Sequence, residues 1–134
     1  MTDELYSEMI LELFKHPANK GTLEQRTLHC EGGNPLCGDK IGYDVLVEDG
    51  KVKDIRFQGT GCAISTASAS LLTTLVQGKT LEEVQALGSK EMFAALGNVI
   101  QTRIKCALLG LSVLKQGLQR WKHGKQEIIT GLMV

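Results

Sequence analysis

Residues 58–68 read Gln-Gly-Thr-Gly-Cys-Ala-Ile-Ser-Thr-Ala-Ser. Gly59 and Gly61 predict a turn at the end of a strand, because glycine adopts backbone angles that other residues avoid. The small residues that follow predict a helix that begins just behind Cys62. A thiol at a helix N-terminus faces unpaired N–H groups and the positive end of the helix dipole, and both favour the reactive thiolate. We therefore predict that Cys62 is a working cysteine exposed at this turn.

The residues before this turn predict a β-hairpin. Apolar side chains alternate along 41–47, Asp49-Gly50 is a strong hairpin turn, and the return strand covers 52–58. A poorer alternation over 21–29 predicts one more strand. The sequence thus predicts a three-stranded antiparallel sheet.

Helical patterns account for most of the remaining chain. The predicted helices cover 3–15, the stretch from Cys62 to about Gln77, a short helix with a Thr80–Glu83 capping box, 89–97 and 101–122. The tail, 126–134, is apolar and could pack on the domain or on a partner. We expect an α+β fold in which the sheet packs against several helices, with residues 1–134 forming one domain.

Composition narrows the possible functions and locations. Lysine plus arginine and aspartate plus glutamate both number 15, so the formal net charge is zero and no basic face for nucleic acid is expected. No run of about 18 apolar residues predicts a membrane span. The acidic N-terminus does not resemble a secretion signal. These features favour a cytoplasmic protein in which thiols stay reduced.

Four cysteines, at 30, 37, 62 and 106, therefore favour metal binding or catalysis over a disulfide framework, although all four could be inert buried thiols. Cys37 and Asp39 lie two residues apart in a loop, within reach of one metal ion, although Asp39 could be an ordinary turn residue. At about 100° per residue, Cys106 falls roughly 120° from the apolar stripe of its helix. This position predicts a thiol on the helix flank and not in the core. Neighbouring cations such as Arg103 and Lys105 lower a thiol pKa, although both residues could belong to an ordinary solvated face, which is the favoured interpretation for Lys105 alone.

Three segments of the chain carry a resemblance to a known family. They are Asn34-Pro35-Leu36-Cys37-Gly38-Asp39, Gly59-Thr60-Gly61-Cys62-Ala63-Ile64-Ser65 and Arg103-Ile104-Lys105-Cys106-Ala107. In this order they resemble the signature segments of the IscU/NifU/SufU family of iron–sulfur cluster assembly proteins. The resemblance implies the family's compact α+β domain, with three cysteines meeting at one exposed end.

The resemblance also implies roles for individual residues. Cys37, Cys62 and Cys106 correspond to ligands of a metal or cluster, and Asp39 to a weaker oxygen ligand that keeps a cluster labile. Cys30 matches no motif and is expected to be a strand or loop thiol outside the site. The serines behind Cys62, Ser65 among them, are interpreted as packing residues.

Two functions within the family remain open on this evidence. The first is a scaffold, not an enzyme, that accepts sulfur from a cysteine desulfurase, binds iron and holds a transient 2Fe-2S cluster for recipient apoproteins or carrier proteins. The second is a SufU-like sulfur acceptor that binds Zn²⁺ and takes a persulfide on one thiol, most plausibly Cys106. Lys105 stands where IscU scaffolds have a histidine and resembles SufU, whereas the short interval from Cys62 to Cys106 resembles IscU.

A third hypothesis lies outside sulfur traffic. Three thiolates and a carboxylate could hold a structural zinc ion. A cysteine hydrolase would need a histidine base near its nucleophile, and the three motifs contain no histidine. We rank this hypothesis below the scaffold and the sulfur acceptor.

Overall fold

The computed structural model describes residues 8–35, 38–97, 99 and 104–133. Its elements are, in order, α1 (Glu8–Lys15), β1 (Leu28–Gly33), β2 (Lys40–Glu48), β3 (Lys51–Thr60), α2 (Ala63–Val76), α3 (Leu81–Ala86), α4 (Ser89–Leu96), α5 (Ile104–Gly124) and β4 (Ile128–Met133). The predicted α+β class is confirmed. No helix in this described part of the chain is long and apolar enough to cross a membrane.

The sheet has four strands in the order β3-β2-β1-β4, so the predicted count of three is one short. β1 and β3 pair antiparallel with β2, as expected, whereas β4 pairs parallel with β1. β4 is formed by the apolar tail, whose partner strand lies far away in sequence. Because no local turn links the two strands, the hairpin signal that predicts β2 and β3 is lacking for β4.

The β2–β3 hairpin and the helices behind it follow the prediction closely. Asp49 and Gly50 both have positive φ, 54° and 73°, as a tight hairpin turn requires. The N-cap of α3 is Thr80, whose hydroxyl accepts a hydrogen bond from the Glu83 N–H while the Glu83 carboxylate accepts one from the Thr80 N–H. The capping box is therefore confirmed.

The strand predicted for 21–29 is wrong over most of its length, because β1 begins only at Leu28. Upstream of β1 the backbone finds other partners. The Gly21 N–H donates to the Phe57 carbonyl at the edge of β3, and the Leu23 N–H donates to the buried carboxylate of Asp44. The segment thus meets β3 in an isolated bridge between Lys20 and Phe57 and does not form the predicted strand.

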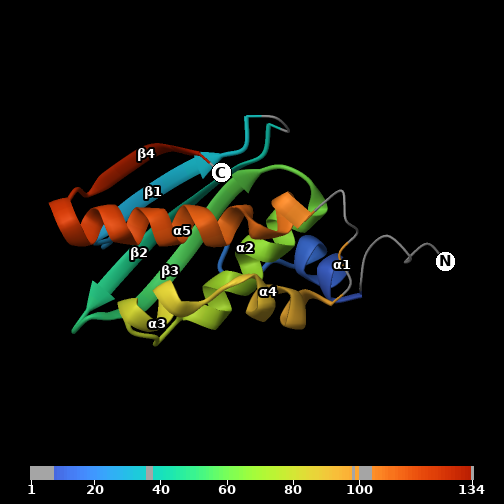
Figure 1. Cartoon of the computed structure of the whole chain (residues 1–134), viewed down its shortest axis with the longest axis horizontal. Helices are drawn as coiled ribbons and strands as arrows, with labels where there is room; N and C mark the ends of the chain where they lie inside the picture. Colours follow the sequence, from blue (N-terminus) through green and yellow to red (C-terminus); the bar gives the residue numbers. More distant parts are fainter. Residues whose placement is uncertain (1–7, 36–37, 98, 100–103, 134) are drawn as a thin grey trace.

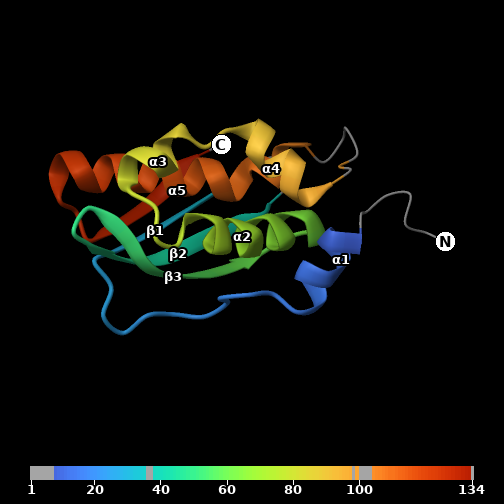
Figure 2. The same cartoon turned by 90° about the horizontal axis from the view of Figure 1, so that it is seen from below.

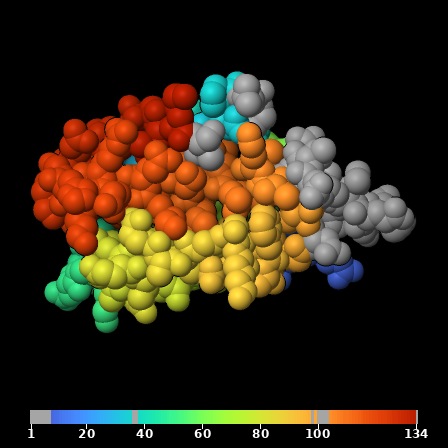
Figure 3. Space-filling view, in the orientation of Figure 1, coloured from blue at the N-terminus to red at the C-terminus, as the bar shows by residue number. Residues whose placement is uncertain are grey.

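The molecule has a layered arrangement around the sheet (Figure 1). α2 and α5 pack together over one face of the sheet, and α5 contacts both β1 and β2. The segment joining α1 to β1 runs along the opposite face (Figure 2). In the space-filling view, α5 lies between β4 on one side and α3 and α4 on the other (Figure 3).

Two glycines let α5 lie directly on the sheet. A Cβ atom at Gly110 would lie 2.5 Å from the Tyr43 hydroxyl, and one at Gly117 would lie 2.4 Å from the Cys30 sulfur. No side chain larger than hydrogen fits at either contact without a shift. This close approach fixes the height of α5, and therefore of Cys106 in its first turn, above the sheet.

Candidate metal centre

Asp39 is held at the entrance to β2 by backbone contacts with the end of β1. The Asn34 N–H donates to the Asp39 carbonyl at 3.1 Å. A Cβ atom at Gly33 would lie 2.6 Å from that same carbonyl oxygen, so the backbone at the end of β1 and the backbone before β2 approach each other closely. Asp39 is 7% exposed, which is more burial than an ordinary turn residue shows. Its place in the fold supports a role beyond the turn.

Cys62 occupies the N-cap position of α2, as the glycine-rich turn predicts. Its backbone is extended, with φ −75° and ψ 170°, and its sulfur caps no N–H group of the described first turn of the helix. The sulfur lies 3.6 Å from the Ser65 hydroxyl. Cys62 is half-buried, so its thiol is accessible although not fully exposed.

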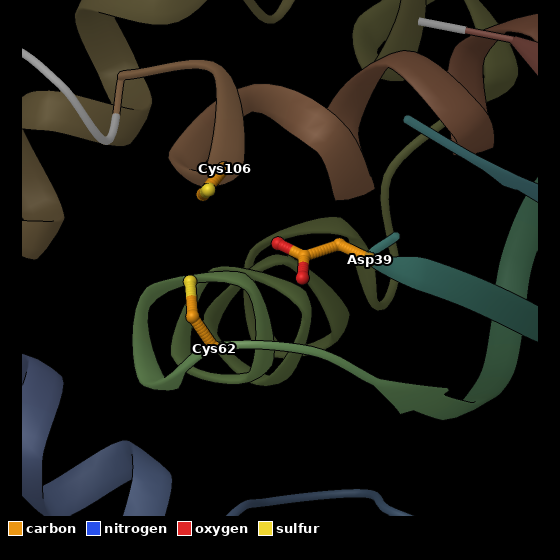
Figure 4. Close-up of side chains that lie close together, drawn as sticks. All are labelled: Asp39, Cys62 and Cys106. Carbon is orange, nitrogen blue, oxygen red and sulfur yellow. The ribbon is translucent and has the colours of Figure 1, made fainter. Parts of the chain in front are cut away.

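Cys106 lies in the first turn of α5 and is only 4% exposed, so the prediction of a thiol outside the core is wrong. The helix flank that carries it faces the starts of α2 and β2 instead of solvent (Figure 4). Burial, together with the neighbouring Cys62 and Asp39, raises the pKa of the Cys106 thiol to about 12. Lys105 is exposed, in agreement with its interpretation as part of a solvated face, and Arg103 lies outside the described residues.

Three predicted site residues meet at one end of the molecule. One ligand atom from each of Asp39, Cys62 and Cys106 lies within 4.8 Å of the other two. The side chains point toward one another from the loop before β2, the start of α2 and the first turn of α5 (Figure 4). Cys37, the remaining predicted ligand, lies outside the described residues. Two thiols and a carboxylate suit zinc or an iron–sulfur cluster.

Other candidate residues lie apart from this cluster. Cys30 lies in β1 and is fully buried against Gly117. Its thiol pKa is raised to about 12, mainly by burial and to a smaller extent by the negative charges of Asp44 and Glu31. Its expected position in a strand is confirmed. His29 bridges two carboxylates on the outer face of the sheet, which the sequence did not predict.

Ser65 is the residue of the site that the sequence interpretation missed. It is fully buried, and its hydroxyl donates a 2.5 Å hydrogen bond to Oδ2 of Asp39. A signal existed, because a polar residue three positions after an N-cap reaches back toward the start of its helix. Packing therefore explains only part of the role of Ser65.

A comparison with protein families identifies the family of the chain. The family model of the NifU-like N-terminal domain matches residues 5–128, nearly the whole chain. This chain belongs to the NifU-like N-terminal domain family. The resemblance of the three motifs is thereby confirmed.

Relatives within the family carry different functional names. The chain is 32% identical over 130 residues to the iron–sulfur cluster assembly scaffold protein IscU 1 of Archaeoglobus fulgidus, covering 96% of this chain and 85% of the relative. It is 36% identical to the scaffold protein IscU of Thermotoga maritima, covering 87% and 94%. It is also 32% identical to the zinc-dependent sulfurtransferase SufU of Bacillus subtilis, covering 91% and 95%.

Solved structures share the fold. FiSufU from Fervidobacterium islandicum superimposes with a TM-score of 0.73 at 30% identity, covering 88% of this chain and 99% of that one. A NifU-like N-terminal protein from Brucella abortus gives a TM-score of 0.75 at 21% identity, covering 91% and 97%. The family fold predicted from the motifs is confirmed. The sheet contains one strand, β4, beyond the three that were predicted.

Proposed function

We propose that this protein is a scaffold for iron–sulfur cluster assembly, with Cys37, Asp39, Cys62 and Cys106 as the ligands of its cargo. The observation that carries the proposal is the convergence of a carboxylate and two thiols from three distant segments within 4.8 Å. Thiolates are the protein ligands that iron–sulfur clusters prefer. The scaffold names of the archaeal and Thermotoga relatives support the same function.

The sulfur of such a cargo comes, in this proposal, from the persulfide of a cysteine desulfurase. A scaffold thiolate attacks the outer sulfur, the S–S bond of the persulfide breaks, and the desulfurase thiolate leaves. Each transferred sulfur then takes up two electrons from a thiol or other reductant to become sulfide. Iron binds the same ligands, and the finished 2Fe-2S cluster passes to an apoprotein or carrier protein.

Anaerobic reconstitution tests the proposal. The purified protein is incubated with ferrous iron, cysteine, a thiol reductant and a cysteine desulfurase. We expect the visible charge-transfer absorption of a 2Fe-2S cluster, with iron and acid-labile sulfide in equal amounts. Cys62→Ala should abolish the absorption. Cys30→Ala removes an equally small thiol outside the site and should retain it, so equal loss in both variants, or no absorption in the wild type, would contradict the scaffold function.

A zinc-dependent sulfur acceptor is the second candidate, favoured by the name of the Bacillus relative and by Lys105 in the third motif. Here zinc stays bound while one thiol carries the persulfide. This function predicts one tightly held zinc ion in protein isolated anaerobically. It also predicts that Cys106→Ser abolishes stimulation of the desulfurase while zinc remains. Because Cys62 is more accessible than Cys106, Cys62→Ser is assayed beside it.

A further inference from the structure

The Asp39 carboxylate is fixed from two sides. Oδ2 accepts the 2.5 Å hydrogen bond from the Ser65 hydroxyl. On the other side the backbone passes so close that a Cβ atom at Gly61 would lie 2.8 Å from both Cγ and Oδ1. The Asp39 carbonyl also accepts a hydrogen bond from the Asn34 N–H, so both the backbone and the carboxylate of Asp39 are held in place.

The Ser65 hydroxyl stands between two of the converging side chains. It lies 2.5 Å from the Asp39 carboxylate and 3.6 Å from the Cys62 sulfur. A hydroxyl has a single proton, and the shorter contact assigns that proton to Asp39. Ser65 thus engages one defined carboxylate oxygen, while α2 sets the position of the hydroxyl relative to Cys62.

Ser68, one turn later on the same helix, provides a contrast. It is equally buried, but its hydroxyl donates to the Ile64 carbonyl at 2.7 Å, a bond within the helix itself. A buried serine in α2 therefore has a local acceptor within reach. The Ser65 hydroxyl donates to a carboxylate 26 positions away instead. The contact of Ser65 is thus specific to the metal centre.

We propose that Ser65 is a positioning residue of the metal centre, which orients the Asp39 carboxylate toward Cys62 and Cys106 without itself binding the metal. This inference rests on the proposed function, since it presumes that Asp39 is a ligand. Hydrogen bonds from residues outside the ligand shell fix the orientation of the ligands. Loss of such a hydrogen bond typically weakens metal binding by a factor of about 10–100.

The test uses zinc alone as the probe, in competition with a chromophoric chelator under anaerobic conditions. Ser65→Ala should raise the zinc dissociation constant about tenfold. Ser68→Ala deletes the same atoms from an equally buried site on the same helix and should leave the constant unchanged. Cobalt(II) supplies a second readout, because its visible absorption reports the ligand geometry: Ser65→Ala should alter the spectrum and Ser68→Ala should not.

A double-mutant cycle shows whether Ser65 acts through Asp39. In an Asp39→Ala background, Ser65→Ala should cause no further loss of zinc affinity. Full additivity of the two losses would overturn the proposal, as would equal affinities for Ser65→Ala and Ser68→Ala. A wild-type protein that binds neither zinc nor cobalt would instead overturn the proposed function, so the two failures are distinguishable.

Discussion

A methyl group at position 61 would collide with the Asp39 carboxylate, so Gly61→Ala tests the packing of the candidate site at a single atom. Its Cβ would lie 2.8 Å from Cγ and Oδ1 of Asp39. We expect zinc binding to weaken about tenfold as the carboxylate is displaced. We expect stability to fall by about 1–3 kcal/mol. Zinc competition and urea unfolding measure the two effects.

Gly21 provides the control for this substitution. It has a similar backbone angle, φ 144° against 157° for Gly61. Apart from its two chain neighbours, however, no described residue has a heavy atom within 4 Å of the position that its Cβ would take. Gly21→Ala therefore imposes a similar backbone cost without touching the site. If both substitutions weaken zinc binding equally, the collision with Asp39 is not the cause.

The sequence predicted the residues that converge at the candidate site better than it predicted their surroundings. Cys62 is detectable because a glycine-rich turn and a helix start are local features. Asp39 and Cys106 needed the family motifs, since their approach to Cys62 depends on the whole fold. The burial of Cys106 was missed because a helical wheel shows the direction of a side chain but not which loops cover it. The hydrogen bond from Ser65 to Asp39 spans 26 positions and has no counterpart in local patterns.

At the scale of secondary-structure elements, the seat of α5 on the sheet depends on a small side chain at Gly117. A Cβ atom at Gly117 would lie 2.4 Å from the Cys30 sulfur and 2.5 Å from its Cβ. Gly117→Ala must therefore push the helix away from β1. Although alanine favours helix, overpacking should dominate and destabilise the protein by about 1–3 kcal/mol.

Urea unfolding followed by circular dichroism measures this change, with Gly124→Ala as the control. Gly124 ends the same helix, and its added Cβ would make only an ordinary 3.7 Å contact with Gln126. We expect this control to retain or slightly raise the wild-type midpoint. Equal midpoints for Gly117→Ala and the wild type would show that α5 does not need the close approach to Cys30.

Helices and strands were predicted correctly where residues close together in the sequence specify them. The β2–β3 hairpin and the α3 cap were predicted because each is specified within a few residues. β1 was misplaced since the upstream residues bond to the edge of β3 and to the Asp44 carboxylate, which are distant in sequence. β4 was missed because a short apolar tail forms a strand only when β1 is available to pair with it.

Across the whole molecule, a network of charged and polar side chains connects the outer face of the sheet with the segment that covers it. Arg26 lies 3.1 Å from the buried Asp44, and His29 Nδ1 lies 2.7 Å from the same carboxylate. The other ring nitrogen of His29 and the Lys40 ammonium each lie 3.0 Å from Glu31. This network ties the segment before β1 to two strands and ends at Lys40, directly after Asp39.

Glu31 makes part of the stability of this network dependent on pH. Its hydrogen bonds with His29 and Lys40 hold the pKa of its carboxyl below the ordinary value of 4.5. The folded protein therefore binds this proton less tightly than the unfolded chain does. The stabilisation is present above pH 4.5 and is lost as the pH falls through the lowered pKa.

Glu31→Gln should consequently destabilise the protein at neutral pH by less than about 1 kcal/mol. The difference from wild type should shrink in acid, where Glu31 is protonated in both states. Urea unfolding at a series of pH values measures it. Glu12→Gln, on the exposed side of α1, should match the wild type throughout. A difference for Glu31→Gln that persists undiminished in strong acid would contradict the assignment.

The burial of Cys106 has a consequence for the resistance of its thiol to oxidants. Oxidants such as hydrogen peroxide attack thiolates that are accessible to solvent. Cys106 is 4% exposed, and burial raises the pKa of its thiol to about 12, so this sulfur is poorly accessible and its thiolate form is disfavoured. Cys106 should therefore resist irreversible oxidation better than the half-buried Cys62 does.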